Sequence, residues 1–107
     1  MDISETQRLM LRRKYARTYV LQMVTEIQRE YEFGGLPKEF FKEFTLLALW
    51  QQMCCVTEEG ILDWMRKWDD LLESYKMHKS LLAFVSRVDA RFFEDVLEQE
   101  QQEKQEE

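Results

Sequence analysis

Hydrophobic residues recur at helical spacing along four segments of the chain, whereas a convincing strand pattern is absent. The first segment covers residues 3–33, and Asp2 or Ser4 can cap the N-terminus of a helix there. Gly34 and Gly35 then supply the left-handed backbone that commonly ends a helix. The pattern predicts one long first helix, with an apolar stripe formed by Leu9, Ala16, Val20, Met23, Ile27 and Tyr31.

A second helix is predicted over residues 37–55, because proline is favoured in the first helical turn. One side of this helix carries the apolar residues Phe40, Phe44, Leu47, Ala48 and Cys55. A second apolar set lies roughly opposite and comprises Leu46, Leu49, Trp50 and Met53. Since a helix that is apolar all round is usually buried on both sides, we expect the second helix to be sandwiched by the others.

Thr57, followed by two glutamates, is a good N-terminus for a third helix that reaches about residue 77. Ser80 can cap a fourth helix, in which Asp89 offers an alternative start for a separate short helix. A kink near Val88 and Asp89, with a fifth short C-terminal helix, is therefore left open. The apolar stripes of these segments are Ile61, Trp64 or Met65, Trp68, Leu72 and Tyr75, and then Leu81, Phe84, Val85, Val88, Phe92 and Val96.

These elements predict an all-α fold, a small single-domain bundle of four main helices over residues 1–97. The scarcity of turn formers in the 107 residues, with 3 Gly and 1 Pro, argues against a β-sandwich or barrel. Residues 98–107 contain no apolar side chain and read as an acidic, glutamine-rich tail that is solvated or disordered. The expected core comprises Phe40, Phe44, Leu47, Trp68, Leu72, Phe84, Val88 and Phe92.

The net charge of −6 means that nucleic acid and anionic membranes repel the chain as a whole. The longest uncharged run, residues 44–57, is too short and too polar to span a bilayer, so we expect no membrane association. Cys54 and Cys55 are adjacent, and neighbouring helical positions point about 100° apart. We therefore expect both thiols to be buried and reduced, in a cytoplasmic, reducing compartment.

Catalytic chemistry has little support in the sequence. The one histidine, His78, lies between lysines at a helix end, and two cysteines with one histidine cannot complete a four-ligand zinc site. Three glycines cannot build a phosphate-binding loop, and the paired Glu-x-x-His motif of di-iron proteins is absent. We expect no enzymatic activity, and no cofactor, metal or small-molecule substrate.

A cluster of cations in the first helix suggests a nucleic-acid site as an alternative function. Tyr15 and Tyr19 are interleaved with these cations and could stack on bases. The cations nearly encircle the helix, however, which favours salt bridges within the domain or with a protein partner. Arg13, at the edge of the apolar face, could pair with Asp89 or Glu94. The cluster comprises Arg8, Arg12, Arg13, Lys14 and Arg17.

The surplus apolar residues of the second helix are the most informative feature for function. If they are not buried by neighbouring helices, they form a patch of the kind that marks an interface. We interpret the chain as a small intracellular protein-binding factor, of a regulator, adaptor, inhibitor or immunity type, that binds another protein or itself as a homodimer. A structural subunit of a larger assembly is a further alternative. The predicted contacts are Leu46, Leu49, Trp50 and Met53, with Arg12, Arg13 and Arg17 as polar contacts.

Overall fold

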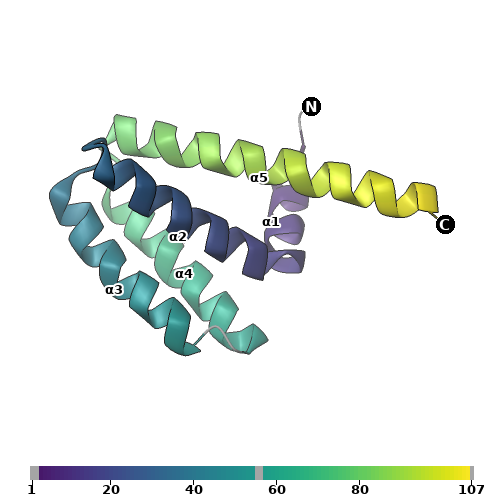
Figure 1. Ribbon diagram of the computed structural model, residues 1–107, viewed down its shortest axis with the longest axis horizontal. Helices are drawn as coiled ribbons and strands as arrows, with labels where there is room; N and C mark the ends of the chain where they lie inside the picture. The colour runs from purple at the N-terminus through teal and green to yellow at the C-terminus, as the bar shows by residue number, and fades with distance from the viewer. Residues whose placement is uncertain (1–2, 55–56, 107) are drawn as a thin grey trace.

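Five α-helices form a bundle in the computed structural model, which describes residues 3–54 and 57–106. Figure 1 shows α2, α3 and α4 leaning against one another below α5, and α1 crossing behind α5. The described residues contain no strand, which confirms the predicted all-α class. The helices are α1 (Glu5–Lys14), α2 (Ala16–Glu32), α3 (Lys38–Cys54), α4 (Glu58–Ser74) and α5 (Lys79–Glu106).

The long first helix predicted over residues 3–33 is instead two helices that meet at Tyr15. Tyr15 has φ −111° and ψ 37°, outside helical geometry, and the chain turns there so that α1 crosses α5 (Figure 1). The turn places Leu11 in the core and leaves Leu9 58% exposed, so Leu9 was wrongly predicted, whereas Ala16, Val20, Met23 and Ile27 of the predicted stripe are buried. Neither glycine nor proline lies at this break. It is stabilised instead by the burial of Leu11 and by contacts of α1 with α4 and α5.

Side-chain and backbone caps set several helix ends close to the positions that the sequence predicts. Ser4 caps α1 in a capping box with Gln7, and the Thr57 hydroxyl accepts the Gly60 N–H at 3.0 Å at the start of α4. At the end of α2, Gly34 has φ +76°, and the N–H groups of Gly34 and Gly35 donate to carbonyls of the last helical turn. This is the Schellman arrangement, in which glycine satisfies the left-handed position.

The core is a cluster of aromatic and aliphatic side chains from all five helices. Phe44 packs edge-on against Trp68 with ring centroids 5.5 Å apart, and Trp64 stacks on Trp68 at 5.9 Å. The indole N–H of Trp64 donates to the backbone carbonyl of Leu47 at 2.9 Å. Of the eight predicted core residues, seven are buried and Leu72 is partly buried, so the sequence prediction of the core is confirmed.

The second predicted helix, α3, lies at the edge of the bundle and is not sandwiched. It packs against α4 and α2 through one face, on which Phe40 and Phe44 are completely buried. The central position belongs to α2, which packs against all four other helices. The main contacts of α3 are with α4 and α2 on one side, so its second face, which carries Leu46 and Met53, remains exposed.

Helix α5 is continuous over its 28 residues, so the kink considered near Val88 and Asp89 is not present. The Asp89 carboxylate accepts a hydrogen bond from Tyr19 in α2 and is therefore not used to cap a new helix. The C-terminal part of α5 projects beyond the other helices (Figure 1), and residues 101–104 are exposed helix. This projection extends the longest dimension to 47 Å and the radius of gyration to 14.5 Å.

Candidate protein interface

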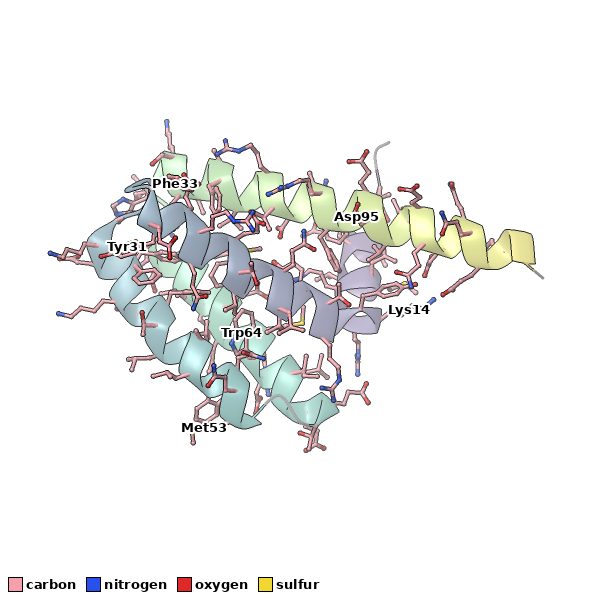
Figure 2. The ribbon with its side chains drawn as sticks, in the orientation of Figure 1. Lys14, Tyr31, Phe33, Met53, Trp64 and Asp95 are labelled. Atoms are coloured by element: carbon pink, nitrogen blue, oxygen red, sulfur yellow. The ribbon has the colours of Figure 1, made fainter. Side chains whose placement is uncertain are left out.

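Four large apolar side chains of α3 face solvent along one stripe, which we call the outer face of α3. The exposed fractions are 70% for Leu46, 53% for Leu49, 39% for Trp50 and 74% for Met53. Figure 2 shows Met53 pointing away from the bundle, while Trp64 lies in its interior. The residues that the sequence singled out as a second apolar stripe are thus an uncovered surface.

A groove of about 420 Å³ runs between α3 and α4 beside the outer face of α3. Its apolar lining comes from both helices, and its polar rim carries charges of both signs. The Lys67 ammonium lies over the Trp50 ring, 5.0 Å from its centroid, so that one face of the ring is covered by a cation of the neighbouring helix. The lining residues are Glu43, Leu46, Leu47, Trp50, Lys67, Asp70, Leu71 and Ser74.

Arg12, predicted as a partner contact, is engaged within the fold. Its guanidinium pairs with Asp69 of α4 at 3.0 Å and lies over the Tyr19 ring at 4.8 Å, and the side chain is 16% exposed. The Nε atom of Arg12 is buried and has no hydrogen-bond partner among the described residues. The ion pair considered between Arg13 and Asp89 or Glu94 is not found among the described residues: Arg13 is exposed, and the neighbouring Arg12 turns inward and pairs with Asp69 instead.

Arg13 and Arg17 lie on a different surface from the outer face of α3. Both line a pocket where the α1–α2 junction faces the start of α4, together with Ile61 and Leu62. The groove beside the outer face of α3 includes neither arginine. The seven predicted contacts therefore divide between two surfaces, one apolar on α3 and one cationic at the α1–α2 junction.

Sequence reasoning missed a polar cluster that joins α2, α4 and α5. The Tyr19 hydroxyl donates to Asp89 at 2.8 Å and accepts the indole N–H of Trp68 at 3.2 Å. Burial raises the pKa of Asp89 above its ordinary value, while the hydrogen bond from Tyr19 and the charge of Arg12 oppose that shift. The available signal for this cluster was a carboxylate, Asp89, directly beside Val88 of the predicted apolar stripe.

A second, more exposed contact joins the α1–α2 junction to α5. The Lys14 ammonium pairs with Glu100 at 2.7 Å, and the Tyr15 hydroxyl donates to the same carboxylate oxygen at 3.2 Å. The hydrogen bond from Lys14 holds the pKa of Glu100 below its ordinary value. These contacts tie the junction at Tyr15 to the projecting part of α5.

The prediction that Cys54 and Cys55 are buried concerns side chains outside the part that the structure describes. Within the described part, no group of three or more His, Cys, Asp or Glu side chains could hold a metal ion. None of the helices over residues 3–54 and 57–106 is both long and apolar enough to cross a membrane. In comparisons with known proteins, no family model matches the chain, and no curated protein or solved structure resembles it significantly.

Proposed function

We propose that this protein is a non-enzymatic binding factor that holds an amphipathic helix of another protein against the outer face of α3. The observation that carries the proposal is the exposure of Leu46, Leu49, Trp50 and Met53 on one face of one helix. Contiguous exposed apolar patches usually mark interaction sites, and Trp and Met are enriched at protein interfaces. Trp50 is the expected anchor, because tryptophan is common among the residues that dominate binding energy.

A helix suits this surface better than an extended segment. The spacing of Leu46, Leu49, Trp50 and Met53 follows one helical stripe, and the neighbouring groove runs between two helices. A partner helix with apolar residues at the same spacing can therefore lie in the groove, as in helix-in-groove recognition. The rim carries Glu43, Asp70 and Lys67, so it favours a partner with charges of both signs beside its apolar stripe.

Regulation, inhibition or neutralisation of a partner protein are the roles that fit a small binding factor of this kind. We place it in the cytoplasm because its two cysteines are adjacent, a spacing that does not suit a disulfide framework and leaves the thiols reduced. The proposal requires no cofactor, since helix packing alone supplies the binding energy.

An affinity-capture experiment with matched variants tests the proposal. The double variant Leu49→Glu/Met53→Glu places two charges on the outer face of α3, and Leu21→Glu places one on an exposed apolar site of α2. All three sites are at least half exposed, so each substitution should change the free energy of unfolding by less than about 0.5 kcal/mol. Urea unfolding verifies this before capture from cells of the source organism.

We expect wild type and Leu21→Glu to capture the same protein, and the double variant to lose it. The captured protein, purified, should form a complex of fixed stoichiometry with the chain. Retention of this partner by the folded double variant would contradict the proposal. Light scattering of the isolated chain over a concentration series tests self-association. A dimer that Trp50→Glu dissociates would show that the outer face of α3 binds a second copy of this chain and not another protein.

A further inference from the structure

Two adjoining pockets form a second groove, in which the α1–α2 junction faces α4. One pocket has a volume of about 390 Å³ and the other about 360 Å³, and Arg13 and Leu62 line both. We call this the basic groove. It is bounded by Leu9, Arg12, Arg13, Lys14, Tyr15, Ala16, Arg17 and Thr18 on one side and by Glu58, Ile61, Leu62, Met65, Arg66 and Asp69 on the other.

The charge of the basic groove is opposite to that of the whole chain. Five cationic and two acidic side chains line it, whereas the protein has a net charge of −6. Arg12 is occupied by Asp69, Lys14 by Glu100 and Arg66 by Asp63, and Arg17 is also engaged in an interaction. Arg13 is exposed and has no hydrogen-bond or ion-pair partner in the part of the chain that the structure describes, so its charge is available to a ligand.

The floor of the basic groove is apolar. Ile61 and Met65 lie nearly buried along α4, Leu62 is half-buried between them and the rim, and Leu9 of α1 is 58% exposed at one end. A ligand that only neutralised the arginines would leave Leu9 and the exposed part of Leu62 in water. The groove is therefore complementary to a ligand that combines an apolar stripe with flanking negative charge.

We propose that the basic groove binds an acidic amphipathic helix of a protein partner, independently of the outer face of α3. Apolar side chains of the ligand contact Leu9 and Leu62, and its carboxylates lie beside Arg13. Nucleic acid fits the groove less well, since Leu9 and Leu62 would find no apolar partner along a sugar–phosphate backbone.

Fluorescence anisotropy with a synthetic peptide tests this proposal. The probe is a fluorescently labelled peptide that forms a helix of roughly five turns. Leucines form one stripe along this helix, and glutamates lie on either side of the stripe. A scrambled peptide of the same composition and a peptide with Lys in place of Glu are the comparison ligands. We expect the acidic amphipathic probe alone to bind, with an affinity that weakens as ionic strength rises from about 0.05 to 0.2 M.

Two variants with the same change in net charge separate local from global electrostatics. Arg13→Glu reverses a charge in the basic groove, and Lys79→Glu reverses one at the exposed start of α5. We expect Arg13→Glu to weaken probe binding by about tenfold and Lys79→Glu to change it by less than about twofold. Leu9→Ser should also weaken probe binding. Because Leu9 is exposed, this variant should fold normally, and it tests the groove even if Arg13→Glu misfolds.

Several results would overturn the proposal. These are absence of probe binding at low salt, equal binding of the scrambled peptide, and equal loss of affinity in Arg13→Glu and Lys79→Glu. Salt-sensitive binding of duplex or single-stranded DNA that Arg13→Glu abolishes, stronger than binding of the probe, would assign the groove to nucleic acid instead. Loss of binding in Leu49→Glu/Met53→Glu would show that the probe occupies the outer face of α3, which separates this inference from the proposed function.

Discussion

Replacing Tyr19 by phenylalanine removes one hydroxyl group and leaves the ring in its packing position. The ring keeps its edge-to-face contact with Phe92, at a centroid distance of 5.0 Å, and remains beneath the Arg12 guanidinium. The hydroxyl, however, connects two groups from other helices. It donates to the Asp89 carboxylate and accepts the N–H of Trp68, so both groups lose a partner.

The cost of Tyr19→Phe follows from the burial of the two groups left behind. Trp68 is completely buried, so water cannot replace the acceptor of its indole N–H. Asp89 also lines a pocket with Arg8 and Arg12 and recovers part of its hydration there. At about 1–3 kcal/mol for each unsatisfied buried group, we expect the free energy of unfolding to fall by about 2–4 kcal/mol.

Urea unfolding followed by tryptophan fluorescence measures this loss directly. Tyr31→Phe is the matched control, because Tyr31 stacks on Phe41 at a centroid distance of 3.7 Å and its hydroxyl makes no hydrogen bond with the described residues. We expect the control to change the free energy of unfolding by less than about 0.5 kcal/mol. A Tyr19→Phe variant as stable as this control would refute the role given to the hydroxyl.

The same variant should alter the pH dependence of stability. Burial holds the folded-state pKa of Asp89 above its ordinary value, so the folded protein binds this proton more tightly than the unfolded chain does. The contribution of Asp89 to stability therefore falls as pH rises from its ordinary pKa of about 4 through the raised folded-state pKa. Tyr19→Phe removes a hydrogen bond that opposes the shift, so its destabilisation should be smaller below about pH 4 than at neutral pH.

Three further predictions test the core, a helix end and the projecting part of α5. Trp68→Ala should lower the free energy of unfolding by about 3–5 kcal/mol, whereas Leu21→Ala at an exposed site should lower it by less than about 1 kcal/mol, both measured by urea unfolding. Gly34→Ala forces a residue with a side chain into φ +76° and should lower the free energy of unfolding by about 1 kcal/mol. Gly35→Ala displaces only the flexible side chain of Glu30 and should lower it by less. An equal loss of stability in the two variants would contradict the left-handed geometry at Gly34. Truncation after Glu100 removes exposed helix and should leave the midpoint of thermal unfolding unchanged; a clear fall would show that the removed residues contact the bundle.

Much of the fold was predictable because the strongest signals in this sequence are local. Apolar spacing identified the helical segments, and Thr57 and Gly34 marked helix boundaries through backbone chemistry that acts within one turn. The break at Tyr15 has no such local signal. It depends on Leu11 reaching the core and on Arg12 reaching Asp69, and these contacts join residues far apart in sequence.

The same distinction applies to the candidate interface. The second apolar stripe of α3 was visible in the sequence, but whether another helix covered it depended on how the five helices pack together. Because α3 packs against α4 and α2 through its other face, the stripe remains exposed. Arg12 joins an internal cluster with Tyr19, while Arg13 faces solvent, because adjacent helical positions point about 100° apart.

Site-specific photo-crosslinking tests the central claim most directly, namely that the outer face of α3 binds a protein partner. A photoreactive residue is placed at position 53, or at position 21 as the control, since Met53 and Leu21 are both exposed apolar residues on different helices. On illumination in cells of the source organism, we predict one discrete crosslinked protein from position 53 and none from position 21. Equal crosslinking from both positions, or none from position 53, would contradict the claim.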